Sequence, residues 1–406
     1  MSRRNSLGMS DAEIEANMQI LVNAFTTDWL NQNTGHPIQT LWQRKDELAT
    51  NELYSLASAI QELSPIDAKW VQEQVKKAKS QDRKNSQGAI FEILALNILH
   101  APEHPVIPAK LNQAGFDGIL TKPGGHDIRV SIKNYGTSAF QQKFDQKAKA
   151  IEKVMVKLLA KFNYPPVQIA LDFPTEYPED RDWKMLEDRI RNIFKDKRHA
   201  ADPFAALAEP LDASKERGPE NARVIFTIFI SPFLHDLEKF HSRYNSYTLM
   251  ISAPYHKNEK ANLFSKIEDA CANLSKHSAT ETDHIINSLF LHLPETISLA
   301  EAVTWLDEYF TLFPNKPITF IILYQPTVST NITDNSSTIN HAIKYYMKDE
   351  AKLKGDYQFS VPVGSVSDES SGFILSADYP DGKRETIKVE NKYLYQQWGT
   401  LHEDAA

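Results

Sequence analysis

Phe116-Asp-Gly-Ile-Leu120 and Ile128-Arg-Val-Ser-Ile-Lys133 decide the fold of this chain, because together they predict a β-hairpin. Both runs are short and rich in apolar or β-branched residues, as strands are. The segment between them, Lys122-Pro-Gly-Gly-His126, contains the residue types that reverse a chain. We therefore predict two antiparallel strands joined by a turn near Gly124.

The second strand should present two chemically different faces. Side chains alternate along a strand, so Ile128, Val130 and Ile132 share one face, and Arg129, Ser131 and Lys133 share the other. If the hairpin folds about Gly124, Asp117 lies opposite Ser131 and diagonal to Lys133, within roughly 5 to 8 Å. A carboxylate and an ammonium group are then expected at one place on the sheet.

The segments on either side of the hairpin read as helices. Residues 88–99 are apolar almost all round, which is typical of a buried helix, and Glu92 is the only charged residue among them. After the hairpin, Ser138 and Gln141 predict the start of an amphipathic helix that extends to Phe162. A strand at 167–173 follows, so this part of the chain is a mixed α/β domain.

The organisation of the whole chain follows from the same kind of pattern. Ser10-Asp-Ala-Glu13 is a capping box at the start of a helical N-terminal module over residues 1–80. The mixed α/β domain is expected over 81–204, a linker rich in Pro and charge over 205–222, and a second α/β domain over 223–406. The expected fold class is α/β.

Glu92 and Asp117 are the candidates for chemistry. A carboxylate in an apolar helix is costly to bury unless it is paired or binds a metal. Hard cations such as Mg²⁺ prefer oxygen ligands, and they assist phosphodiester hydrolysis. An acid-bearing helix around Glu92, then Gly-Phe-Asp117-Gly opening a hairpin, then Val-Ser131-Ile-Lys133 before an amphipathic helix resembles the core of the PD-(D/E)XK superfamily, the restriction-endonuclease-like nucleases.

This resemblance covers about residues 87–173 and implies a role for each matching position. Asp117 would be the central metal ligand, with the backbone carbonyl of Ile132 beside it. Lys133 would be the catalytic lysine, and Glu92 the helix acid that some branches use. Ser131 stands where the family usually has Asp, Glu or Gln, so a second carboxylate must come from Glu92 or from Asp145. Without either, the site would be a poor catalyst or an inactive one.

The resemblance also implies a function, partners and a cofactor. It implies a Mg²⁺-dependent DNA endonuclease, with Mn²⁺ as a substitute, in bacterial restriction or anti-phage defence. Arg129, Gln141 and Gln142 are candidate substrate-binding residues. A second copy of the chain or a partner protein of a defence system is the other expected partner. The competing hypotheses are a catalytically inactive nuclease-fold protein that binds nucleic acid or serves as a scaffold, and an unrelated α/β interaction protein.

Each candidate residue also has a structural explanation. Lys133 at a strand end could be a surface residue, and Asp117 a turn residue. Glu92 could form a buried ion pair with Arg83, Lys84 or Arg129. His126 and Asp127 fit the turn, and Gln141 fits a helix cap.

Composition excludes several other classes. The net charge is −8, but residues 66–161 contain 16 Lys or Arg and 9 Asp or Glu. This basic segment suits a phosphate backbone, and lysines on solvated helix faces would equally explain it. Cys271 is the only cysteine, which excludes internal disulfides and CxxC zinc sites and favours a cytoplasmic location. HExxH, GxGxxG and P-loop patterns are absent, and no apolar run is long enough to span a membrane.

Overall fold

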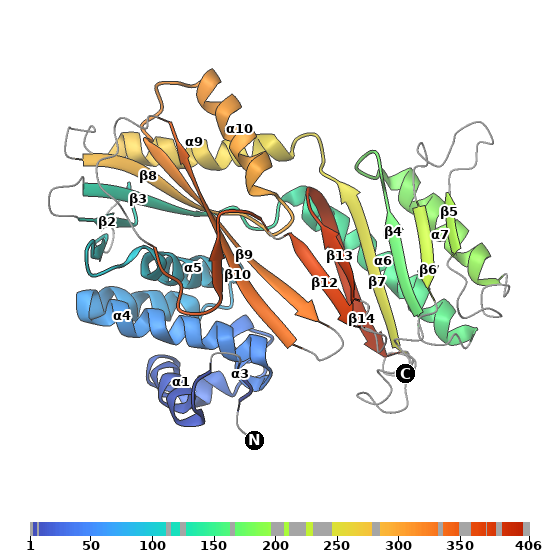
Figure 1. Ribbon diagram of the computed structural model, residues 1–406, viewed down its shortest axis with the longest axis horizontal. Coiled ribbons are helices and arrows are strands. Elements are labelled where there is room, and N and C mark those ends of the chain that lie inside the picture. Colours follow the sequence, from blue (N-terminus) through green and yellow to red (C-terminus); the bar gives the residue numbers. More distant parts are fainter. Residues whose placement is uncertain are drawn as a thin grey trace. The chain divides into compact units, whose positions relative to one another are not determined.

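The computed structural model describes most of the chain, whose course Figure 1 shows. The described residues are 3–5, 8–110, 115–121, 127–162, 167–195, 207–210, 225–229, 246–277, 285–331, 336–348, 359–370, 372–378 and 384–400. They form two compact units, each built from more than one segment. The first unit comprises Met1–Gly136, Leu263–Ala377 and Thr386–Lys388, and the second comprises Thr137–Asn262, Asp378–Glu385 and Val389–Ala406.

The first unit begins with helices, as predicted for residues 1–80. They are α1 (Asp11–Phe25), α2 (Thr27–Leu30), α3 (Pro37–Gln43), α4 (Glu47–Ala78) and α5 (Arg83–Leu99). The capping box at the start of α1 is confirmed, because the Ser10 hydroxyl accepts a hydrogen bond from the Glu13 N–H and the Glu13 carboxylate accepts one from the Ser10 N–H. Apolar side chains of α1, α4 and α5 share one core with the sheet of this unit.

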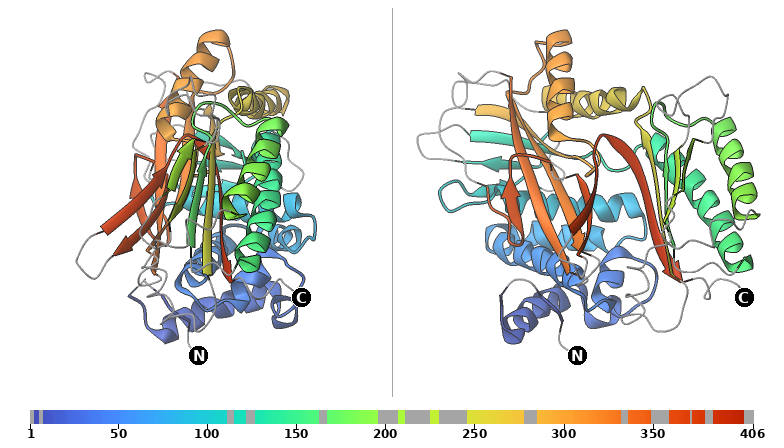
Figure 2. Two further views of the ribbon diagram at one scale, coloured as in Figure 1. Left: turned by 90° about the vertical axis from the view of Figure 1, so that its right-hand side faces the viewer. Right: turned by 45° about the vertical axis from the view of Figure 1, so that its right-hand side comes forward.

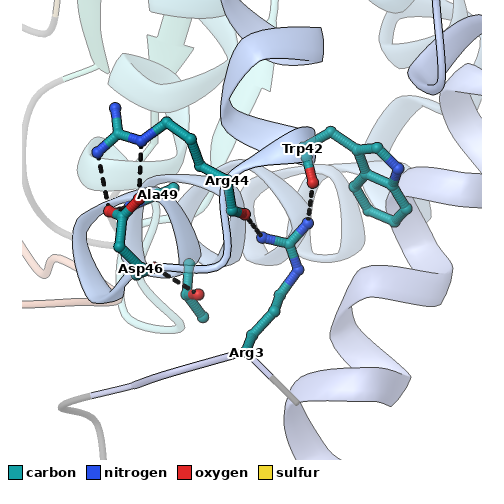
Figure 3. A network of polar contacts seen from close by, with 6 residues as sticks. Arg3, Trp42, Arg44, Asp46 and Ala49 are labelled. Carbon is teal, nitrogen blue, oxygen red and sulfur yellow. Dashed lines mark hydrogen bonds and ion pairs between the residues drawn. The ribbon is translucent and has the colours of Figure 1, made fainter. Parts of the chain in front are cut away.

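Arg3 connects the start of the chain to the junction between α3 and α4 (Figure 3). Its guanidinium donates to the carbonyl oxygens of Arg44 at 2.7 Å and Trp42 at 2.6 Å. Asp46 pairs with Arg44 and accepts a hydrogen bond from the Ala49 N–H, which caps α4. This network sets the direction in which α4 leaves the junction.

The helix α4 is interrupted near Pro65. Asp67 has φ −151° and ψ 86°, which lie outside the helical region, and its carboxylate accepts a hydrogen bond from the Trp70 N–H at 2.9 Å. Proline removes one backbone hydrogen bond of a helix, and Asp67 caps the stretch that follows. The second half of α4 is therefore a separately capped stretch, and it carries Gln74 and Lys77 alongside α5.

A mixed β-sheet forms the centre of the first unit. Its main path runs in the order β1 (Val106–Pro108), β2 (Gly118–Leu120), β3 (Asp127–Asn134), β8 (Ile285–His292), β9 (Phe320–Asn331), β10 (Ser336–Met347) and β11 (Ser365–Ser367). β12 (Phe373–Asp378) pairs with β9, and β13 (Arg384–Val389) pairs with β12. The predicted hairpin is confirmed, since β2 and β3 are antiparallel with Gly118 opposite Val130. On its other edge β3 is parallel to β8.

The apolar face of β3 is confirmed as a core face. Ile128, Val130 and Ile132 are buried in the same core as Leu96 of α5. Gly118 allows α5 and β2 to approach closely, because a Cβ atom at this position would lie 2.7 Å from Leu96 Cδ2. This contact sets the separation between the helix that carries Glu92 and the strand that follows Asp117.

A Gly118→Ala substitution is therefore expected to destabilise the first unit. The added methyl group would overpack the contact with Leu96, at a cost of about 1–3 kcal/mol. Gly88 on α5 offers a matched control, because a Cβ atom there meets nothing within 4 Å. Gly88→Ala should instead stabilise the helix by about 0.8–1.0 kcal/mol. Differential scanning calorimetry would measure both, and equal shifts in the same direction would contradict the packing argument.

The second unit contains its own sheet. The strand order is β14 (Lys392–Thr400), β7 (Ser246–Pro254), β4 (Val167–Asp172), β6 (Ile225–Phe229) and β5 (Leu207–Pro210). The helices α6 (Ala139–Lys161) and α7 (Asp180–Lys195) pack on one face of this sheet, in green in Figure 2. α9 (Glu259–His277) leads from this unit into the first one, where α10 (Leu299–Leu312) follows.

The α/β class is confirmed, but the two units do not follow the predicted domain boundaries. The predicted domain over 81–204 divides after Gly136, because β3 pairs along its whole length with a strand from residues 285–292. The N-terminal helices belong to the same unit as that sheet. Within the predicted linker of 205–222, Leu207–Pro210 forms β5, and the remaining linker residues lie outside the described ones. In the described part of the chain, each helix is too short or too polar to cross a membrane.

Candidate functional site

Asp117 is fixed against β3 by its backbone and its side chain. Its N–H donates to the Val130 carbonyl oxygen at 2.8 Å, and its own carbonyl oxygen accepts from the Ala109 N–H at 2.9 Å. The carboxylate atom Oδ2 accepts a hydrogen bond from the Ile132 N–H at 2.6 Å. Asp117 therefore lies directly before β2 and is held against β3, so it is not a solvated turn residue.

Burial and the neighbouring polar groups change the pKa of the Asp117 carboxyl group in opposite directions. Burial raises the pKa of this carboxyl group above its ordinary value. The Ile132 N–H, the ammonium groups of Lys133 and Lys77, and the Ser131 hydroxyl act in the opposite direction. The ionised form is thus desolvated but surrounded by hydrogen-bond donors and positive charge, a combination that marks a candidate functional site.

Glu92 projects from α5 toward the same place. Gln74 Nε2 donates to its carboxylate atom Oε2 at 2.8 Å. Burial raises the pKa of Glu92 to about 7, and the negative charge of Asp117 adds to the increase. Lys77, Gln74 and Lys133 oppose it. Glu92 and Asp117 are close enough to repel each other, and near neutral pH Glu92 is partly protonated.

The polar face of β3 contributes the remaining predicted residues. Lys133 is half-buried and stabilises the charged forms of both Glu92 and Asp117. Ser131 is buried, and its hydroxyl interacts with the Asp117 carboxylate. The Arg129 guanidinium lies 5.9 Å from the centre of the Phe116 ring. The structure thus brings Glu92, Asp117, Ser131 and Lys133 together.

Gln74 and Lys77, which the sequence pattern did not predict as site residues, are part of this cluster. Both lie on the second half of α4, one helical turn apart. Gln74 is 3% exposed, and its Oε1 atom has no hydrogen-bond partner in the part of the chain that the structure describes. The sequence could have identified Gln74 as a buried polar residue, because it falls on the same helix face as the apolar residues Val71, Val75 and Ala78. A glutamine at a core position calls for a polar partner.

A groove of about 610 Å³ lies between α4 and α5, and it reaches Glu92. Lys76, Lys77 and Lys84 line it together with Gln74. Its volume is within the range of ligand-binding sites, roughly 300–1,000 Å³. The Glu92 carboxylate is therefore accessible from a basic surface.

Three predicted residues lie on α6 in the second unit. Gln141 Nε2 donates to Asp145 Oδ1 at 2.8 Å, and burial raises the pKa of Asp145. The Gln141 N–H donates to Ser138 Oγ at 3.0 Å, which confirms the predicted cap, and Gln142 Nε2 donates to the Thr137 carbonyl oxygen at 3.1 Å. Each of the three thus has a local structural role, and the second carboxylate beside Asp117 is Glu92.

Two further expectations concern the hairpin turn and the partners of Glu92. Asp127 is the first residue of β3 and not a turn residue, because it pairs with Ile285 of β8. His126 and the rest of 122–126 lie outside the described residues. Glu92 was expected to pair with Arg83, Lys84 or Arg129 if its role were structural. In the structure its carboxylate instead accepts a hydrogen bond from the neutral amide of Gln74. Arg83 belongs to α5, and its side chain lies outside the described set.

The acidic and histidine residues limit what kind of metal the site could hold. Within the described ranges, no group of three or more His, Cys, Asp or Glu residues is arranged to hold a metal ion. The cluster instead offers two carboxylates, a buried amide oxygen and backbone oxygens. A donor set composed of oxygen suits Mg²⁺ or Mn²⁺, and does not suit zinc.

No protein-family model, curated protein or solved structure matches this chain.

Proposed function

We propose that this protein is a divalent-metal-dependent nuclease that hydrolyses phosphodiester bonds of DNA, with a restriction-endonuclease-like core in its first unit. The observation that carries the proposal is the pair formed by Glu92 and Asp117. Two desolvated carboxylates repel each other, and together with Lys133 they cluster beside one strand. A bound cation would relieve this repulsion. A buried carboxyl group whose pKa is strongly raised by desolvation and by a specific charged neighbour is a candidate functional group.

The residues fit a hard cation. Asp117 and Glu92 would hold it, and the buried Gln74 Oε1, which lacks a hydrogen-bond partner among the described residues, is a further oxygen donor. The N–H and C=O groups of one strand residue leave the strand on the same edge. Since the Ile132 N–H points to Asp117, its carbonyl is available on that edge as well. When bound, Mg²⁺ would polarise the phosphate and lower the pKa of a water molecule.

Each side chain then has a role of its own. The Lys133 ammonium group would stabilise negative charge that develops on the phosphate oxygens. Ser131 would orient Asp117 by hydrogen bonding, which explains how a neutral residue can stand at this position. Glu92 must be ionised to hold the cation, so proton loss from its carboxyl group accompanies metal binding. A role in bacterial defence rests on the family resemblance alone.

A second candidate is an inactive nuclease-fold protein that binds nucleic acid. The observation in its favour is that the described cluster contains two carboxylates and not three, with Ser131 at the usual position of an acid. This protein would bind DNA through the same surface without cutting it.

Cleavage assays separate the two candidates. Purified protein is incubated with supercoiled plasmid, linear duplex, single-stranded DNA and RNA, in Mg²⁺, Mn²⁺ or EDTA. We expect metal-dependent cleavage of DNA, and Lys133→Ala should lower its rate roughly 10²–10³-fold, as removal of one charge-stabilising donor does. Lys110→Ala, at an exposed position of the same unit, is the control and should cleave at the wild-type rate. Binding without cleavage in either metal would refute the nuclease.

A further inference from the structure

The groove between α4 and α5 is basic along its rim. Lys76, Lys77 and Lys84 line it, and all three are exposed. Lys76 has a loose ion pair with Glu73 at 3.9 Å, which leaves its charge largely available. Lys77 stabilises the ionised forms of both Glu92 and Asp117. Positive charge therefore extends from the outer groove to the carboxylate pair.

The α5 side of the groove is kept open by Gly88. A Cβ atom at this position would meet no atom within 4 Å, so the absent side chain is not required by packing. Glycine in the interior of a helix lowers its stability. Gly88 lines the groove, and a larger residue would extend into it.

Gln74 gives an independent indication of a ligand. It lines the groove and is 3% exposed, and its Oε1 atom lacks a hydrogen-bond partner in the described part of the chain. A buried acceptor without a donor is destabilising. A hydrogen-bond donor or a cation that enters the groove would satisfy it.

We propose that the groove between α4 and α5 binds a single strand of nucleic acid, with its phosphates on Lys76, Lys77 and Lys84, and leads this strand to Glu92. This inference deepens the proposed nuclease function and rests on it. The groove has a volume of about 610 Å³, the size of a small-ligand site, so it can enclose a short stretch of one strand but not a base-paired duplex. Lysine ammonium groups contact the phosphates of a single strand regardless of sequence.

The test measures binding in EDTA, where cleavage does not interfere. Fluorescence anisotropy with a labelled single-stranded DNA of mixed sequence is recorded for wild type and for Lys76→Ala/Lys77→Ala/Lys84→Ala. Affinity should fall about tenfold or more, and the slope of log K against log salt should decrease in magnitude by about 2, as expected for three lost contacts to a single strand. The triple variant Lys149→Ala/Lys153→Ala/Lys157→Ala removes three exposed charges from α6 and is the matched control.

A second set of variants leaves the charge unchanged. Binding should weaken progressively from Gly88→Ala to Gly88→Leu as the side chain fills the groove, and circular dichroism would confirm that both variants fold. Equal losses in the two triple variants, or wild-type binding by Gly88→Leu, would overturn the groove assignment. Duplex DNA bound as tightly as the single strand, and weakened equally by the groove substitutions, would overturn the assignment to a single strand.

The outcomes for the groove and for catalysis are separable. If the groove variants lose binding but wild type cleaves nothing, the groove assignment stands and the nuclease fails. If wild type cleaves and the groove variants bind and cleave normally, the nuclease stands and the groove assignment fails.

Discussion

An Asp117→Asn variant is expected to lose cleavage activity while unfolding at a higher temperature than wild type. Loss of a metal-binding carboxylate removes several kcal/mol of transition-state stabilisation, which corresponds to at least roughly a 10³-fold lower rate. The gain in stability has a separate cause. Burial raises the pKa of Asp117, so its ionised form disfavours the folded state near neutral pH, and the neutral amide removes this effect. The amide oxygen can still accept the Ile132 N–H.

Asp127→Asn is the matched control for this experiment. It makes the same chemical change at an exposed position on β3 and should alter neither activity nor unfolding temperature. Plasmid cleavage and calorimetry in EDTA would provide the two measurements. Loss of activity alone cannot distinguish a structural role of Asp117 from a metal-binding role. An inactive Asp117→Asn variant that is less stable than wild type would show that the role is structural.

Metal binding is expected to depend steeply on pH through Glu92. Its pKa is raised to about 7 by burial and by Asp117, so about a tenth of the molecules have it ionised at pH 6. Affinity for Mg²⁺ or Mn²⁺ should therefore fall about tenfold per pH unit below 7 and level off above it. Isothermal titration calorimetry in buffers of different ionisation enthalpy would measure both the affinity and the released proton.

Without metal, the Glu92 carboxyl group should make the protein less stable as pH rises. The folded state holds a proton on Glu92 that the unfolded chain has already released, so between about pH 4.5 and 7 stability falls with increasing pH, by up to about 3 kcal/mol. Glu92→Gln should remove both this decline and the pH dependence of metal binding. Glu103→Gln, at an exposed position, should preserve both. A pH-independent affinity in wild type would show that Glu92 is not a ligand.

The local parts of the structure could be predicted from the sequence. Alternation along β3 correctly identified its buried face, and the turn residues around Gly124 led to the observed pairing of Gly118 with Val130. Glu92 could be predicted as a candidate site residue because it is the only charge in an apolar helical segment, and its raised pKa agrees with that prediction. These features depend on residues close together in the sequence.

The unit boundaries and the α4 residues could not be predicted, because they depend on distant pairings. Nothing near β3 indicates that its parallel neighbour is residues 285–292. Asp145 stays a predicted ligand, and its observed partner on α6 is Gln141. Gln74 and Lys77 join the site because α4 packs on α5, and a helical pattern shows which face is buried but not against which partner.

The discontinuity of the first unit has a consequence for biosynthesis. β3 carries Lys133, and its second neighbour, β8, lies more than 150 residues later in the chain. A ribosome adds roughly 5–20 residues per second, so many seconds pass between the synthesis of β3 and the synthesis of β8. During this time the strand that carries Lys133 is paired on one edge at most. The strand that carries Lys133 therefore completes its pairing only after β8 has been synthesised, a delay that depends on the order of the segments alone.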